Sequence, residues 1–225
     1  MSFEFLSTGP GAVARSPMER EALAAGARLE QRDGWNVAVS FDGEEAERER
    51  LRGSVGFADS SYLGKIELQG EIGEQLELGR ARLVDGAWWC PYTHERAIVL
   101  CEPGRTAALV ERLEEEARAA GRLTSVIEMT SVLGALTIAG PLAREVFARF
   151  TALDLRPNVT PVHGFRPGSV ARGPGAVLRQ DEERYLMLFG AALGRYMWTV
   201  VADACASLGG APVGVDALEG ATVHA

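Results

Sequence analysis

The chain has 225 residues, of which 47% are hydrophobic and 24% are charged. That balance is too apolar for a disordered chain and too charged for an integral membrane protein, and the length is sufficient for a core without disulfides or metal ions. The formal net charge is −8, from 23 Lys and Arg against 31 Asp and Glu. It argues against nucleic acid as a partner, because such binding depends on neutralising phosphates.

The first half of the chain is predicted to alternate helices and strands. Apolar spacing and turn residues predict, in chain order, an irregular lead-in over residues 1–17, a helix over 17–30 with Ser16 as its N-cap, a strand over 35–41, a charged helix over 43–52, strands over 55–59 and 64–69, a short helix over 71–78, a hairpin around Asp85-Gly86, a strand over 96–101 and a helix over 106–120. The Asp-Gly pair is a frequent two-residue hairpin turn.

The second half repeats this order of elements. It predicts strands over 124–129 and 133–139, a helix over 142–152, short strands over 168–170 and 175–178, a turn at Glu182 and Glu183, a strand over 185–189 and a helix over 195–208 capped by Gly209-Gly210. Hairpins between the strands favour an α+β fold with mixed or antiparallel sheets. We therefore expect one domain over 18–225, built from two split βαβ (ferredoxin-like) halves with a boundary near residue 122.

The cysteines and the N-terminus predict a reduced, cytoplasmic protein. Cys90, Cys101 and Cys205 are widely spaced and form no CxxC pair, so a zinc or redox motif is not expected. We expect Cys90 and Cys101 to stay reduced. The N-terminus has no signal-peptide pattern, and no apolar run approaches the roughly 20 residues of a membrane span. A membrane is therefore not predicted as a partner.

No motif in the sequence indicates an active site. Phosphate-binding, zinc-protease and nucleophile-elbow patterns are absent, and we predict neither catalytic nor metal-binding residues. The three histidines stand alone: His94 is expected at an exposed turn and His224 at a frayed end. His163 lies in a loop, where it could belong to a site.

The most unusual local feature is the sequence Trp88-Trp89-Cys90. Adjacent residues on a strand point to opposite faces, so one tryptophan can be core while the other faces a groove or a partner. Two interpretations stay open: a core residue beside a half-exposed one, or the wall of a pocket for a flat ligand or an interface anchor. Cys90 has no basic residue close by in sequence, so nothing predicts a lowered pKa for its thiol.

Four blocks in order resemble the glycine-cleavage T-protein (aminomethyltransferase) family. They are AGARLEQRDGWNVAVSF (25–41), VGFADSSYLGKIELQG (55–70), VIEMTSVLGALTIAGPLAREVFARFTALDL (126–155) and YLMLFGAALGRYMWTVVADACASLGGAPVGVDAL (185–218). The family's blocks read "ALGARMVxFxGWxMPVQY", "VGLFDVSHMGKIxVxG", "DVTxxxAxLAIQGPxAxxVL" and an ending "PxGxxAL". The resemblance is collinear over about 25–218 and implies the T-protein-like folate-binding fold.

The departures from the family pattern are informative. The family has a Gly-Gly-x-x-Asp-Asp segment whose Asp lies near folate, whereas this chain reads DGAWWCPY, with Trp89 and Cys90 at the carboxylate positions. Neither residue can hold the amine during proton transfer. Tyr62 and Leu63 replace the His and Met of "DVSHMG". Arg179 keeps the Arg of the contracted "RTGYTGExGFE" segment, and Glu182 is a shifted match for its pterin-binding Glu.

The resemblance implies tetrahydrofolate as the cofactor and a groove between the two halves. The residues expected to line it are Tyr62, Leu63, Trp88, Trp89, Leu100, Arg179 and Glu182. Length and motif loss agree best with the small gamma subunit of heterotetrameric sarcosine oxidase, and we expect the C-terminal barrel of the full enzyme, about 90 residues, to be absent. The KGCYxGQE-like motif of the iron–sulfur-repair branch is absent.

Three functions follow as alternatives. The first is a non-catalytic, gamma-type subunit or stand-alone homologue that keeps or has lost its folate groove. The second is an active tetrahydrofolate-dependent aminomethyl or methyl transferase using other carboxylates; the nearest are Asp59, Asp85, Asp181 and Glu182. The third is a structural protein whose apolar surface is covered by oxidase-like partner subunits or by a second copy of the chain.

Overall fold

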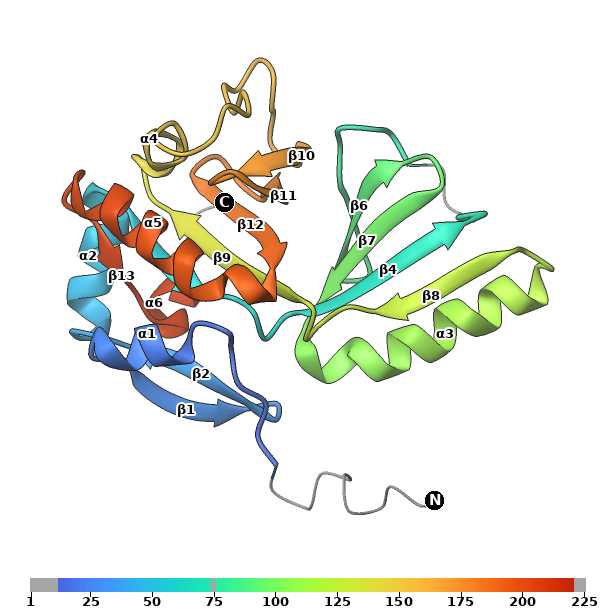
Figure 1. The fold of residues 1–225 in the computed structure, drawn as a ribbon, viewed down its shortest axis with the longest axis horizontal. Coiled ribbons are helices and arrows are strands. Elements are labelled where there is room, and N and C mark those ends of the chain that lie inside the picture. Colours follow the sequence, from blue (N-terminus) through green and yellow to red (C-terminus); the bar gives the residue numbers. More distant parts are fainter. Residues whose placement is uncertain (1–11, 74–75, 221–225) are drawn as a thin grey trace.

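The computed structural model describes residues 12–73 and 76–220. This part of the chain forms two lobes, each built on one β-sheet, with a separate two-stranded hairpin beside the larger lobe (Figure 1). The predicted α+β class with mixed or antiparallel sheets is confirmed, because antiparallel pairs predominate and one pair is parallel.

The helices and strands have the following bounds. The helices are α1 (Glu19–Ala24), α2 (Glu44–Gly53), α3 (Thr106–Ala119), α4 (Ala143–Phe147), α5 (Gly194–Ala206) and α6 (Val215–Gly220), with 3-10 turns at Pro103–Arg105 and Ala191–Leu193. The strands are β1 (Arg28–Arg32), β2 (Trp35–Ser40), β3 (Gly56–Asp59), β4 (Gly64–Gly70), β5 (Arg82–Val84), β6 (Ala87–Thr93), β7 (Arg96–Cys101), β8 (Thr124–Glu128), β9 (Leu133–Ala139), β10 (Phe165–Val170), β11 (Gly173–Arg179), β12 (Arg184–Gly190) and β13 (Ala211–Pro212).

The two sheets take their strands from different parts of the chain. The six-stranded sheet has the order β10-β11-β12-β9-β3-β13, and the five-stranded sheet has the order β5-β6-β7-β4-β8. Only β13 and β3 pair in parallel among the named strands. The five-stranded sheet uses the continuous stretch between β3 and β9, so the six-stranded sheet takes strands from both sides of it.

Each long helix covers the outer face of one sheet. Helix α3 connects β7 to β8, with β4 between them, and α5 connects β12 to β13 across β9 and β3. Both connections are split crossovers. The buried stripe of α3 is Leu109, Leu113 and Ala117, at the spacing of one helix face.

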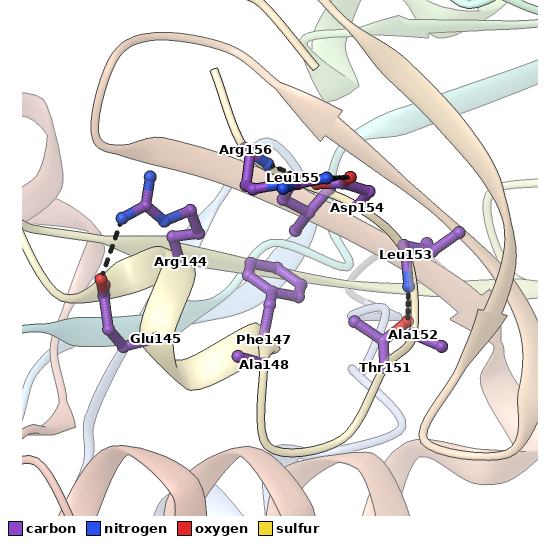
Figure 2. A pocket seen from close by; sticks show the side chains of 10 residues that line it. All are labelled: Arg144, Glu145, Phe147, Ala148, Thr151, Ala152, Leu153, Asp154, Leu155 and Arg156. Atoms are coloured by element: carbon purple, nitrogen blue, oxygen red, sulfur yellow. Dashed lines mark hydrogen bonds and ion pairs between the residues drawn. The ribbon is translucent and has the colours of Figure 1, made fainter. Parts of the chain in front are cut away.

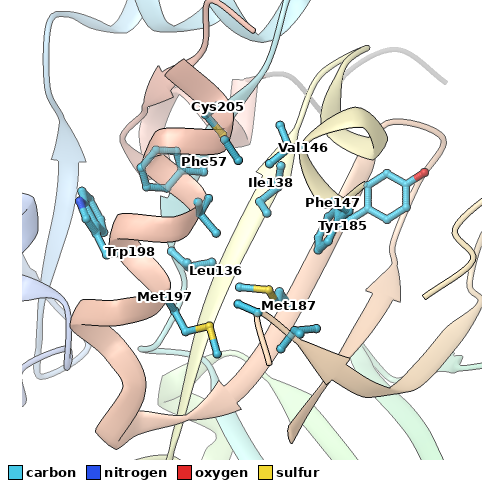
Figure 3. Close-up of a cluster of buried hydrophobic side chains, with 14 of the residues drawn as sticks. Phe57, Leu136, Ile138, Val146, Phe147, Tyr185, Met187, Met197, Trp198 and Cys205 are labelled. Atoms are coloured by element: carbon cyan, nitrogen blue, oxygen red, sulfur yellow. The ribbon is translucent and has the colours of Figure 1, made fainter. Parts of the chain in front are cut away.

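The largest core cluster lies between α5 and the six-stranded sheet. Met197 and Trp198 of α5 belong to this cluster together with Leu136 and Ile138 of β9 (Figure 3). The Trp198 ring meets the ring of Phe57 edge-on, with 5.0 Å between centroids. Since aromatic and branched side chains interlock here, this cluster anchors the larger lobe.

The predicted helix over 17–30 is wrong in its second half. Helix α1 ends at Ala24, Gly26 follows with a φ of +92°, and the chain then enters β1, which pairs with β2. The helix also begins later than predicted, at Glu19 with Met18 in the N-cap position, although Ser16 Oγ accepts from Met18 N and donates to the carboxylate of Asp59. The left-handed glycine and the Asp33-Gly34 turn set up a hairpin that the apolar spacing did not indicate.

Two further helices differ from prediction. Residues 71–73 and 76–78 form no helix, and Gly73 lies so close to Arg122 that a Cβ would meet its guanidinium at 2.2 Å. The helix predicted over 142–152 ends at Phe147, because Thr151 donates to the carbonyl of Ser169 (2.6 Å) and draws the chain toward β10. Gly73 therefore interrupts the first of these predicted helices, and the side-chain hydrogen bond of Thr151 ends the second.

Candidate functional site

Strand β6 turns its two tryptophans to opposite faces of the five-stranded sheet. Trp88 is half-buried on the face toward the other sheet, whereas Trp89 is 7% exposed on the face toward α3. This alternation was predicted from the strand periodicity. The two residues therefore belong to two different surroundings, described below as the inner and the outer face.

The inner face packs against the six-stranded sheet through an apolar cluster. Leu100 and Cys90 are buried in it, and Leu63 and Trp88 pack at its edge. Trp88 and Leu100 are cross-strand partners on β6 and β7. The other members of this inter-sheet cluster are Ala81, Ile98, Ala135, Phe165, Ala176, Leu178, Leu186 and Leu188, with Tyr92 and Leu133 also at the edge. Three predicted lining residues, Leu63, Trp88 and Leu100, are thus brought together.

His163 lies at the rim of the inter-sheet cluster in a strained backbone conformation. Its φ is +66°, and its ring meets the Trp88 ring edge-on with 5.0 Å between centroids. The backbone is fixed on both sides, since His163 N donates to Arg179 O (2.8 Å) and Ala81 N donates to His163 O (2.7 Å). The other described non-glycine residues with positive φ sit in two-residue hairpin turns. Strain outside such turns marks the Trp88–His163 pair as a candidate site.

Arg179 and Glu182, which were expected to line the folate groove, lie near this rim, and their side chains have other surroundings. The buried guanidinium of Arg179 donates to the carbonyls of Thr160 (2.9 Å) and Glu182 (2.9 Å), and it lies over the ring of Tyr185. Its donors are directed to backbone atoms, so it stabilises the turn after β11. The side chain of Glu182 is exposed at that turn.

Tyr62 and Leu63 diverge although they are neighbours. Tyr62 packs against Val37 and Val39 of β2, and burial raises the pKa of its hydroxyl to about 12. Leu63 instead joins the inter-sheet cluster. The turn that separates them is held by Lys65, whose side chain is completely buried.

Lys65 is a functional candidate that the sequence did not reveal. Its Nζ donates to Ser61 O (2.8 Å) and Leu63 O (2.7 Å), and burial lowers the pKa of its ammonium to about 8. The apolar neighbours Ile66 and Leu68 correctly place Lys65 on the other face of β4. Nothing in the sequence indicates that the connection from β3 covers that face, so the sequence alone would predict an exposed lysine.

The carboxylates proposed for an alternative chemistry do not gather at one place. Asp59 is buried, accepts from Ser61 N (2.9 Å) and from Ser16, and has its pKa raised by burial. Asp85 is exposed on the β5–β6 turn and pairs with Arg112 (3.5 Å). Asp181 and Glu182 are exposed at the turn before β12. Asp59 is therefore the buried carboxyl of this set.

The cysteines carry no reactive thiolate. All three are free and buried, and burial raises the pKa of each thiol, that of Cys205 to about 12. Cys90 lies within the inter-sheet cluster, whereas Cys101 lies on the outer face beside Thr106. Because β6 and β7 present them to opposite faces, the two side chains point apart.

The outer face of β6 borders a hollow of about 580 Å³. It lies between α3, the β5–β6 hairpin and the start of the β4–β5 connection. Trp89 is the predicted lining residue that reaches it. Its indole N–H is buried and has no hydrogen-bond acceptor among the described residues.

A second hollow, of about 270 Å³, lies between α4 and the loop that follows (Figure 2). Its two arginines are already paired: Arg144 donates to Glu145 (3.2 Å), and Arg156 donates to Asp154 (2.9 Å), which lowers the pKa of the Asp154 carboxyl to about 2. None of the predicted lining residues borders this hollow. Its four charged side chains are thus paired with one another.

The part of the chain that the structure describes contains no group of three or more His, Cys, Asp or Glu side chains placed to hold a metal ion. No described helix is both long and apolar enough to cross a membrane.

The rim of the inter-sheet cluster at Trp88 and His163, called here the inner rim, suits the binding of a flat ring better than proton transfer. Trp88 and His163 offer aromatic surface, and the inter-sheet cluster offers an apolar wall. The pteridine of a folate has such a flat face, so these residues fit part of that cofactor. The guanidinium of Arg179 is occupied by backbone carbonyls, so it does not provide a free anchor for the glutamate tail.

Sequence comparison finds aminomethyltransferases. The chain is 40% identical over 57 residues to the aminomethyltransferase of Picosynechococcus sp. (25% of this chain, 16% of that protein) and 27% identical over 158 residues to that of Frankia alni (60% and 42%). The match thus spans about a sixth of the first relative's length and less than half of the second's. No family model matches the chain.

Structural comparison finds the same fold in two solved proteins. The glycine cleavage system aminomethyltransferase T from Bartonella henselae superimposes with a TM-score of 0.74 at 18% identity, over 91% of this chain and 60% of that one. A chain of the heterotetrameric sarcosine oxidase from Corynebacterium sp. U-96 superimposes with a TM-score of 0.66 at 19% identity, over 86% of this chain and 95% of that one. The predicted resemblance to the T-protein-like folate-binding family and the predicted fold are confirmed.

Proposed function

We propose that this chain is a folate-binding, non-catalytic subunit of a sarcosine-oxidase-like complex. The observation that carries the proposal is the structural match to a chain of heterotetrameric sarcosine oxidase, which extends over 95% of that chain. The corresponding match to aminomethyltransferase T extends over 60% of the enzyme. A fold shared over nearly the whole of one subunit supports a role of the same kind.

The chemistry of β6 supports the non-catalytic part of the proposal. By the resemblance, Trp89 and Cys90 occupy the positions of the family's two carboxylates. The Cys90 thiol is buried in the inter-sheet cluster with its pKa raised, and Trp89 faces away toward α3. Neither group can take a proton from an amine bound at the inner rim near neutral pH.

The residues that would hold a folate are those at the inner rim. Trp88 and His163 would contact the flat ring, while Leu63 and Leu100 would support Trp88 from the inter-sheet cluster. Tetrahydrofolate, when bound, would supply the acceptor for a one-carbon unit. The strained backbone of His163, fixed by two hydrogen bonds, would keep the ring contact in place.

The first experiment measures binding of 5-formyltetrahydrofolate to the purified chain by calorimetry. Trp88→Leu should weaken binding about tenfold, since ring stacking contributes on the order of 1 kcal/mol beyond buried area. Trp89→Phe should leave it nearly unchanged because that ring faces α3. Saturable binding that is lost with Trp89→Phe alone would overturn the inner-rim assignment. No binding to the chain would overturn the folate part.

The second experiment tests assembly. The chain is mixed with the purified other subunits of a sarcosine-oxidase-type complex from the same genome, and the masses of the products are measured by native mass spectrometry. A stoichiometric complex that contains this chain supports the subunit role. A chain that remains alone or associates only with itself contradicts it and leaves a stand-alone homologue.

The second candidate function is an active tetrahydrofolate-dependent aminomethyl or methyl transferase. It is favoured by the 40% identity to an aminomethyltransferase over 57 residues. Asp59 is the carboxyl to test, because it is buried and its pKa is raised. Transfer from sarcosine or an aminomethyl donor to tetrahydrofolate, retained in Asp59→Glu but lost in Asp59→Asn of equal stability, would establish this function in place of the first.

A further inference from the structure

The hollow beside the outer face of β6 has the features of a small-molecule site. Its volume of about 580 Å³ lies within the usual range for ligand pockets. The buried side chains of Leu68, Trp89, Leu113 and Ala117 form its inner wall. Such a wall favours the apolar body of a ligand.

Two buried N–H donors at this hollow have no acceptor among the described residues. They are Trp89 Nε1 and Arg122 Nε, and both residues line the hollow. Buried donors are normally satisfied, so an acceptor supplied by a ligand in this hollow would complete the hydrogen bonding of both groups. Trp89 has an indole with a single donor, and Arg122 adds a positive charge.

The charges around the hollow distinguish its two arginines. Arg112 is paired with Asp85 (3.5 Å) and with Glu116 (3.7 Å) at the rim. Arg122 is half-buried, and no ion pair involves it within the described ranges. A ligand acceptor that carries negative charge would therefore be drawn to Arg122 in preference to Arg112.

We propose that this hollow binds a small amphipathic carboxylate. The apolar body packs on Trp89 and Leu113, and the carboxylate oxygens accept hydrogen bonds from Trp89 Nε1 and Arg122. Because both nitrogens are buried in the free chain, the proposal includes a side-chain movement that exposes them to the ligand. The site is separate from the inner rim, because Trp89 and Trp88 lie on opposite faces of β6, and it does not depend on folate binding.

Octanoate is the probe, and its binding to the whole chain is measured by calorimetry. Wild type should bind it saturably, and 1-octanol should bind about tenfold more weakly because it lacks the charged acceptor. Trp89→Phe keeps the ring and removes the donor, and Arg122→Met keeps the stem and removes the charge. Each should weaken octanoate binding by about tenfold, the worth of one hydrogen bond to a charged group.

Two matched variants control for the loss of a ring and of a charge elsewhere. Trp35→Phe replaces a half-buried indole on β2, and Arg118→Met removes an exposed arginine from α3. Both should bind octanoate as wild type does. The proposal is overturned if octanoate does not saturate, if 1-octanol binds equally well, or if Arg122→Met binds like Arg118→Met. Arg122 is partly exposed, so its variant keeps the test valid even if Trp89→Phe unfolds.

Discussion

The inner and outer faces of the five-stranded sheet are covered very differently, although both carry apolar side chains. On the inner face, Cys90 and Leu100 are closed off by a second sheet, and even Lys65 is fully buried. On the outer face, α3 leaves a hollow beside Trp89. What covers a strand, and not the strand's own alternation, therefore decides whether a face becomes a core or a site.

A carboxylate placed on the inner face should cost more stability than any other change proposed here. Cys90→Asp should lower the free energy of unfolding by about 4 kcal/mol, because it buries a charge without a partner. Cys90 has no accessible surface and apolar neighbours. Urea unfolding measures the loss. The substitution also returns a carboxylate to one of the two positions where the family has it.

Cys90→Asn is the matched control, since it has nearly the same shape and no charge. It should cost less than Cys90→Asp at pH 7, and the gap should close as the pH falls toward 4. An Asp variant as stable as wild type that binds 5-formyltetrahydrofolate more tightly would mean that the inner face is an open groove. The contrast between the two faces would then fail.

The pH dependence of stability at Lys65 tests whether the inner face is closed to water. Its native pKa of about 8 lies below the unfolded value of 10.5, so between these values the unfolded chain holds a proton that the native chain has lost. Unfolding then takes up a proton, and stability from this group rises with pH. At about 1.4 kcal/mol per pKa unit, wild type should gain up to about 3 kcal/mol relative to Lys65→Met between pH 8 and 10.5.

The comparison with Lys65→Met is needed because other groups oppose this trend. The three buried thiols have raised native pKa values, so their contribution falls as the pH rises above about 9. That loss is common to both proteins and cancels in the difference. Lys65 is the single lysine of the chain, so the NMR signal of its labelled Cε carbon follows one group. A midpoint near 10.5 in the native protein would show that the inner face is open to water.

Much of the fold is predictable from the sequence because the signals are local. The strands β7 and β9 have the predicted bounds, and the Asp85-Gly86 turn has both residues at positive φ, as its hairpin type requires. The errors arise where a distant contact ends an element. Thr151 reaches Ser169, and β1 forms only because β2 returns beside it.

The candidate site was predictable only in part. Alternation along β6 separates Trp88 from Trp89, and resemblance points to the connection that carries Leu63. The strain at His163 has no signature in a lone loop histidine, because it depends on hydrogen bonds to Arg179 and Ala81. The hollow beside Trp89 depends on how closely α3 packs, which no spacing in the sequence specifies.

Truncating one leucine on each side of the sheet should give a smaller difference in stability. Leu100 on the inner face is 2% exposed and enclosed by both sheets, while Leu113 of α3, which packs against the outer face, is 5% exposed and borders the hollow. Leu→Ala costs the lost transfer energy plus a term for the cavity that remains. At Leu113 a void already adjoins the side chain, so truncation loses fewer contacts and enlarges a space that water can enter.

Leu100→Ala should therefore destabilise the chain by about 1 kcal/mol more than Leu113→Ala, within the range of 2–5 kcal/mol for such changes. Parallel urea titrations with equal m-values measure the difference. Adding octanoate should recover stability in wild type and in Leu100→Ala to the same extent, because the ligand binds the native outer face. Equal losses at the two positions, or recovery confined to one of these two proteins, would mean that the hollow is packed like a core and that the faces do not differ.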